Sequence, residues 1–166
     1  MPKTLLLVRH AKSSWDHAGL RDHERPLLQT GIERTKLVAE FLSGNAVIPD
    51  LIVSSHAIRA FETAVIFAEV LGYPQNEILI ESNIYYQDAE QLYDLAMSLP
   101  DDKDVVMMVG HNPAMTQFAS MFLTDMSDYM PTTGVVCIGF ETDHWSHLPT
   151  ATTNLHFCIS PKMLKK

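Results

Sequence analysis

The sequence predicts an α/β domain built around a mainly parallel sheet with helices on both faces. Short continuous apolar runs alternate along the chain with segments in which apolar residues recur at helical spacing. Alternation of strand and helix favours parallel strands, and continuous apolar runs are typical of strands buried on both faces. The 166 residues are 46% hydrophobic, which suits one core, and no repeat, linker or low-complexity tract interrupts them. We therefore expect a single domain over residues 1–166.

The expected strands are short apolar runs, at about residues 4–8, 51–54, 78–80, 105–109, 134–140 and 155–159. The expected helices lie at about residues 31–42, 58–71, 92–99 and 113–123. Thr30 and Glu33 have the spacing of a capping box at the start of the first helix. Gly72 ends the second helix, and Asn112 is placed to cap the fourth. Strand and helix therefore alternate up to about residue 123, and two further strands follow.

Charge and hydropathy argue against two classes of partner, nucleic acid and membrane. The net charge is −8 at pH 7, which argues against nucleic acid, because phosphate backbones require clustered lysine and arginine. No apolar stretch approaches the length that spans a membrane. The apolar run at residues 4–8 is too short for the core of a signal peptide, and Arg9 ends it. We expect a cytoplasmic protein that binds neither nucleic acid nor membrane; the sequence does not indicate its oligomeric state.

The cysteines and histidines do not have the spacing of metal ligands. Cys137 and Cys158 lie in separate strand-like runs and form no C-x-x-C pair, so we expect buried free thiols in a reducing compartment. The eight histidines show no H-E-x-x-H motif. We therefore expect neither a metal site nor a cofactor.

Histidine and arginine follow three of the predicted strands at the point where each strand ends. Arg9 and His10 follow the first strand, and His111 follows the strand at residues 105–109. Ser54-Ser55-His56 closes the second strand, and Arg59 lies one turn into the next helix. Ligands of parallel α/β sheets bind beyond the carboxyl ends of the strands. The sequence therefore predicts one site that contains two histidines and two arginines.

These residue types at one site indicate phosphate chemistry. Arginine presents a permanently charged fork that matches phosphate oxygens, and the start of the helix after Ser55 adds backbone N–H donors. A histidine beside two arginines is a poor metal ligand, because nearby cations oppose the metal charge. It is suited instead to be a nucleophile that attacks phosphorus. The arginines and a second, protonated histidine would stabilise the negative charge that spreads over the equatorial phosphoryl oxygens.

Three motifs in order resemble the signatures of the histidine phosphatase superfamily, which has the phosphoglycerate-mutase-like fold. They are Leu5-Leu6-Leu7-Val8-Arg9-His10-Ala11, Ser54-Ser55-x-x-x-Arg59-Ala60-x-x-Thr63 and Gly110-His111-Asn112. The Arg-His-Ala sequence, Asp22-x-x-Arg25-Pro26-Leu27 with Gly31, and Ile159-Ser160-Pro161-Lys162 resemble the SixA-like branch, which includes protein phosphohistidine phosphatases. The resemblance implies that His10 is the phosphorylated nucleophile and that Arg9, Arg59 and His111, with His111 cationic, bind the phosphoryl group.

Two departures from the family pattern concern the proton donor. Asp16 stands where many members have an asparagine that contacts phosphate, and an ionised aspartate would repel the substrate. Larger members carry a glutamate acid on an inserted segment, whereas the comparable stretch at residues 83–88 is short and offers no equivalent. The general acid is therefore either a protonated Asp16 or absent. Arg25 is equally compatible with an anchor behind the site and with a solvated loop residue.

The function that these features predict is a metal-independent phosphatase acting through a phosphohistidine intermediate. Its substrate is either phosphohistidine on a protein or a small phosphorylated molecule, and the short loops favour an open site that accepts a protein. Two rivals remain. A phosphate-binding module with little turnover is compatible with the missing acid, and a mutase would require a closed pocket for which the chain is short.

Overall fold

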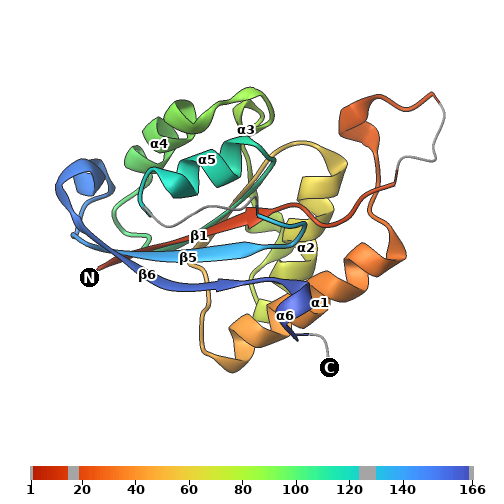
Figure 1. The fold of residues 1–166 in the computed structure, drawn as a ribbon, viewed down its shortest axis with the longest axis horizontal. Coiled ribbons are helices and arrows are strands. Elements are labelled where there is room, and N and C mark those ends of the chain that lie inside the picture. Colours follow the sequence, from red (N-terminus) through yellow and green to blue (C-terminus); the bar gives the residue numbers. More distant parts are fainter. Residues whose placement is uncertain (1, 15–18, 124–129, 165–166) are drawn as a thin grey trace.

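A sheet flanked by two helical layers forms the centre of the molecule, as the computed structural model of residues 2–14, 19–123 and 130–164 shows (Figure 1). The strands of the described residues are β1 (Lys3–Arg9), β2 (Leu51–Ser54), β3 (Leu79–Ile80), β4 (Val105–Gly110), β5 (Val135–Glu141) and β6 (Thr152–Ile159). The α-helices are α1 (Gln29–Gly44), α2 (Ile58–Leu71), α3 (Asn83–Tyr86), α4 (Ala89–Met97), α5 (Ala114–Ser120) and α6 (Pro161–Leu164). Short 3₁₀ turns add η1 (Asp22–Glu24), η2 (Gln75–Glu77) and η3 (Trp145–Thr150). The predicted α/β class is therefore confirmed.

The order of the strands brings the ends of β1, β2 and β4 to one edge. Among the described residues the order is β3-β2-β4-β1-β5-β6, with parallel pairing from β3 through β1. Strand β5 is antiparallel to both β1 and β6, so β6 runs in the same direction as β1. The predicted mainly parallel sheet is thus correct, with one reversed strand. The last residues of β6 consequently reach the same edge as Arg9 at the end of β1.

Strand β1 divides the core because its alternate side chains point to opposite faces. Leu5 and Leu7 are fully buried in a cluster with residues of α4, α5 and η3. Leu6 and Val8 are fully buried in a second cluster with residues of α1 and α2. Helices therefore cover both faces, as predicted. Within the described part of the chain, none of the helices has the length and apolar character needed to cross a membrane.

The helix boundaries follow local chemistry that the sequence specified only in part. Helix α2 spans 58–71 as expected, and Gly72 ends it in the left-handed conformation with φ 73°. The capping box predicted for α1 is wrong: the helix begins at Gln29, Leu28 is its N-cap, and Thr30 lies inside the first turn. Helix α5 is shorter than predicted, at residues 114–120. Cys137 is buried and free as expected, but Cys158 is exposed, because its side of β6 carries no covering element.

Gly31 lets α1 approach the loop that follows β1. A Cβ atom at this position would lie far inside van der Waals contact with the carbonyl oxygen of Lys12. That same oxygen accepts a hydrogen bond from the backbone N–H of Leu28 at 3.0 Å. The close packing therefore fixes the start of α1 against the segment that carries His10.

We predict opposite effects for two alanine substitutions in α1. Gly31→Ala should lower the free energy of unfolding by about 1–3 kcal/mol, because the added methyl group forces the helix away from Lys12. Gly44→Ala is the matched control: its Cβ meets open space, so it should be neutral or stabilise by up to about 1 kcal/mol. Chemical denaturation measures both, and equal stability of the two variants would contradict the close approach.

Candidate active site

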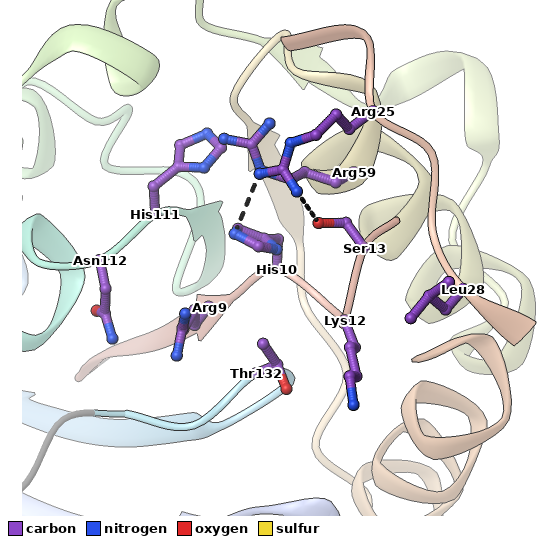
Figure 2. A pocket seen from close by; sticks show the side chains of 10 residues that line it. All are labelled: Arg9, His10, Lys12, Ser13, Arg25, Leu28, Arg59, His111, Asn112 and Thr132. Carbon is purple, nitrogen blue, oxygen red and sulfur yellow. Dashed lines mark hydrogen bonds between the residues drawn. The ribbon is translucent and has the colours of Figure 1, made fainter. Parts of the chain in front are cut away.

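A pocket of about 410 Å³ lies at the sheet edge where β1 and β4 end. Figure 2 shows the side chains around it: Arg9, His10, Lys12, Ser13, Arg25, Leu28, Arg59, His111, Asn112 and Thr132. All four residues predicted for the site are among them. Four of the lining side chains are lysine or arginine, so the pocket is strongly cationic on a protein whose net charge is −8.

The imidazole of His10 is held as one tautomer. Its Nδ1 lies 2.7 Å from the carbonyl oxygen of Ala11, which can only accept, so Nδ1 carries the hydrogen and donates it. Nε2 therefore bears a lone pair, and the Arg59 Nε–H points toward it at 3.4 Å (Figure 2). The ring is only 8% exposed. Nε2 is therefore unprotonated, and its lone pair accepts the Arg59 Nε–H among the arginines of the pocket.

Burial also keeps His10 uncharged. Desolvation lowers its pKa to about 4, and the nearby charges of Arg59, Arg9 and Arg25 add to that effect. The imidazole is consequently neutral at pH 7. A neutral ring is the form that attacks an electrophile, so the cations that would bind phosphate also maintain the reactive state.

A hydrogen-bonded link joins the end of β1 to α2. The backbone N–H of Ala11 donates to Thr63 Oγ1 at 2.9 Å, and this hydroxyl donates to the carbonyl oxygen of Arg59 at 2.6 Å. Thr63 is fully buried. Threonine at the end of the second motif therefore fixes the position of His10 relative to Arg59.

Arg9 and Arg59 reach the pocket from different elements. Arg9 Nη1 donates to the carbonyl oxygen of Met130 at 3.1 Å, while its buried Nε has no hydrogen-bond partner among the described residues. Arg59 Nη1 and Nη2 donate to the backbone oxygen and carboxylate of Asp22 at 2.7 and 2.9 Å. An unpaired buried donor is costly, so Arg9 Nε is available for an anion in the pocket.

His111 is oriented by the second motif. Its Nε2 lies 2.8 Å from Ser55 Oγ, which also accepts the backbone N–H of Ala57 at 3.2 Å. The ring centroids of His111 and His10 are 5.2 Å apart, and His111 Nδ1 is buried with no hydrogen-bond partner among the described residues. Burial, followed by the charges of His10 and Arg59, lowers the pKa of His111 to about 3. The expectation of a cationic His111 is therefore wrong for the unliganded protein, because burial, together with the neighbouring cations, disfavours a charge on this ring.

Asp22 connects Arg59 to Arg25 and to Tyr85, and the sequence alone had assigned no site role to Asp22 or Tyr85. Its carboxylate accepts from Arg59, from Arg25 Nε at 3.1 Å and from the hydroxyl of Tyr85. Partial burial raises the pKa of Asp22, but the Tyr85 hydrogen bond and the charges of Arg59 and Arg25 outweigh it and bring the pKa to about 2. Asp22 is thus ionised at pH 7 and offsets part of the cationic charge.

Arg25 is an anchor in the pocket wall rather than a solvated loop residue. It is 8% exposed, and its Nη1 donates to Ser13 Oγ at 3.0 Å and to the Ser14 carbonyl oxygen at 3.3 Å. Asp22 and Arg25 are three residues apart, a spacing at which opposite charges pair in a helical turn. That spacing could have indicated the pairing of Asp22 with Arg25 from the sequence alone. No sequence pattern indicated Tyr85, because it comes from the distant helix α3.

The other residues weighed in the sequence analysis contribute little to the described pocket or lie outside the described residues. The stretch at 83–88 forms α3 and supplies Tyr85, and among its residues that the structure describes no glutamate occurs. His56 does not line the pocket; its ring lies 5.2 Å from that of Tyr85. Asp16, the alternative general acid, lies outside the described residues. In the segments that the structure does describe, no group of three or more metal-ligating side chains is found.

The chain belongs to the histidine phosphatase superfamily. Residues 5–92, more than half of the sequence, match the profile of branch 1 of that superfamily. An uncharacterized chloroplastic protein of Arabidopsis thaliana is 38% identical over 128 residues, which cover 72% of this chain. The matched region spans 58% of the plant protein's length.

Solved structures show the same fold. The protein histidine phosphatase SixA, complexed with tungstate, superposes with a TM-score of 0.82 at 19% identity, covering 98% of this chain and 99% of the other. A protein from Nakamurella multipartitia, provisionally described as the phosphohistidine phosphatase SixA, gives a TM-score of 0.83 at 20% identity over 97% of each chain. The resemblance to the SixA-like branch is thus confirmed in the fold.

The depressed pKa of His10 predicts a dependence of stability on pH. Between the ordinary histidine pKa of 6.5 and about 4, the unfolded chain binds a proton that the folded chain does not. Stability should therefore fall as the pH falls through this range, by about 1 kcal/mol per pH unit from His10. Denaturation at several pH values should give a shallower slope for His10→Gln, whereas the exposed His147→Gln should retain the wild-type slope. An unchanged slope in His10→Gln would contradict the burial of a neutral ring.

Proposed function

We propose that the protein is a phosphatase that transfers a phosphoryl group from its substrate to His10 and then to water. One observation carries the proposal: His10 Nε2, unprotonated and in contact with the Arg59 Nε–H, faces a pocket lined by three arginines. Arginine forks stabilise the charge that spreads over the equatorial oxygens during phosphoryl transfer. A module that only bound phosphate would have no need of a neutral imidazole at this position.

The reaction has two displacements. In the first, His10 Nε2 forms a bond to phosphorus while the bond to the leaving atom breaks, and the leaving atom takes up a proton. In the second, the oxygen of a water molecule bonds to phosphorus as the bond from phosphorus to Nε2 breaks. The water gives up a proton to the phosphate or to solvent, inorganic phosphate leaves, and Nε2 recovers its lone pair. Arg9 Nε, a buried donor without a partner among the described residues, is suited to hold a phosphoryl oxygen, and so is His111 Nδ1 once that ring is protonated. The charge of the bound phosphate would raise the pKa of His111 and favour its cationic form.

The proposed substrate is phosphohistidine on a protein. Asp22, the carboxylate that pairs with Arg59 and Arg25 of the pocket, has a pKa of about 2 and is a poor proton donor at pH 7. A departing imidazole does not require a strong acid, since it leaves as the neutral ring after taking a proton from solvent. An alkyl alcohol does require one. Small phosphomonoesters with good leaving groups are the alternative substrates.

We predict that a phosphoryl group can be trapped on His10. Rapid quenching of the enzyme with an aryl phosphate should yield an adduct that is acid-labile and base-stable, as expected for a phosphorylated imidazole. Mass spectrometry of the peptides should locate it at His10, and His10→Ala should form none. His56→Ala is the matched control, because His56 lies at the rim without lining the pocket, and it should still form the adduct. An undiminished adduct in His10→Ala would rule out the proposed nucleophile.

We further predict a steep dependence of rate on the leaving group. A general acid typically contributes about 10²–10⁴-fold, so kcat/KM for alkyl phosphates should fall about 10²-fold or more below that for aryl phosphates. The measurement is kcat/KM across phosphomonoesters of graded leaving-group pKa. Alkyl and aryl esters hydrolysed at the same rate would contradict an acid-poor site.

Repeating that series with Asp16→Asn and Asp22→Asn distinguishes the two carboxylates. If neither is the acid, the slope of the series should be the same in both variants as in the wild type. A loss restricted to alkyl esters in one variant would identify that residue as the proton donor.

A further inference from the structure

A second pocket, of about 540 Å³, adjoins the phosphate pocket. Its lining residues come from three parts of the chain: Arg34, Leu37, Pro131, Thr132, Ser160, Pro161 and Lys162. Thr132 lines both pockets, so the two are neighbours across a single residue. A group bound in the phosphate pocket therefore has the second pocket beside it. We call this second pocket the flanking pocket.

The topology of the sheet brings the flanking pocket to the site. Strand β6 runs parallel to β1, so Ser160, Pro161 and Lys162 follow it at the edge where β1 ends at Arg9. Helix α6 packs against α1, which contributes Arg34 and Leu37 (Figure 1). Ser160-Pro161-Lys162 has no role in the proposed phosphoryl transfer. These residues nevertheless lie at the same sheet edge as Arg9, where they line the flanking pocket.

The loop before β5 separates the two pockets. Thr133 has a positive φ of 56°, which is rare for a β-branched residue. Its N–H donates to the carbonyl oxygen of Arg9 at 3.0 Å, and its Oγ1 lies 3.0 Å from that of the buried Thr35 in α1. These contacts fix the adjacent Thr132 between the pockets. The wall shared by the two pockets is therefore attached both to the end of β1 and to α1.

The lining of the flanking pocket combines two cations with apolar surface. Leu37 is 41% exposed although it is a large apolar side chain. Within residues 2–14, 19–123 and 130–164, neither Arg34 nor Lys162 has an ion-pair or hydrogen-bond partner. Two cations without partners are notable on a chain of net charge −8. Their charge complements an acidic group, and the apolar lining residues Leu37, Pro131 and Pro161 complement a hydrocarbon chain.

We propose that the flanking pocket binds an acidic side chain of the substrate protein, next to the phosphohistidine whose phosphoryl group is transferred to His10. This inference rests on the proposed function. The methylene groups of an aspartate or glutamate would contact Leu37 and Pro161, and its carboxylate would lie between Arg34 and Lys162. The pocket thereby selects phosphohistidines with acidic neighbours over those with neutral neighbours.

The test compares three phosphohistidine compounds: a peptide with glutamates flanking the phosphohistidine, the same peptide with glutamines, and free phosphohistidine. Wild-type enzyme should hydrolyse the acidic peptide with a KM lower by on the order of tenfold, as expected for two ion pairs at a partly covered site. Arg34→Gln with Lys162→Gln should abolish this preference and leave kcat/KM for free phosphohistidine unchanged. Lys36→Gln is the matched control, an exposed cation of α1 outside the flanking pocket, and should retain the preference.

Two results would overturn the inference while leaving the proposed function intact. One is equal KM for the acidic and neutral peptides with wild-type enzyme. The other is a preference that persists in the double variant. By contrast, turnover of an aryl phosphate with no turnover of any phosphohistidine compound would refute the proposed substrate, and the inference with it.

Discussion

The hydrogen bond from His10 Nδ1 to the carbonyl oxygen of Ala11 determines what the pocket can do. At 2.7 Å it fixes the tautomer and leaves Nε2 as the only nitrogen able to attack. The geometry depends on Ala11, whose own N–H is held by Thr63 of α2. Arg59 lies one turn earlier on that helix and presents its Nε–H to His10. One continuous set of contacts thus positions His10, the proposed nucleophile, relative to Arg59.

Electrostatics supports the same arrangement. Arg9, Arg25 and Arg59 lie around a buried ring, which disfavours a charge on the imidazole and favours an anion in the space beside it. Asp22 pairs with Arg59 and Arg25 in the unliganded protein and so limits the repulsion among cations. These two ion pairs offset part of the free-energy cost of placing several cations close together. Arg9 Nε has no hydrogen-bond partner among the described residues, so it remains a donor for an anion in the pocket.

The sequence was sufficient to predict the sheet and to bring four residues to one pocket, three at strand ends and Arg59 at the start of α2. Buried apolar runs can only be strands or buried helices, and parallel order then brings Arg9, His10 and His111 to one edge. Contacts between distant segments were harder to predict, because they depend on tertiary packing. Tyr85 reaches Asp22 across 63 positions of sequence, and no local pattern indicates that pair. The neutral state of His111 was also missed, since its pKa depends on burial and on neighbouring charges that only the folded structure specifies.

The central claim is that His10 is a neutral imidazole with its hydrogen on Nδ1 and an unprotonated Nε2 that accepts the Arg59 Nε–H. Nitrogen-15 NMR of the histidine side chains tests it directly, with His10→Gln used to assign the signals. At neutral pH the His10 ring should give one protonated nitrogen, at Nδ1, and one unprotonated nitrogen, at Nε2. Two protonated ring nitrogens, or a hydrogen on Nε2, would contradict the claim, because neither form can attack phosphorus from the position that faces the arginines.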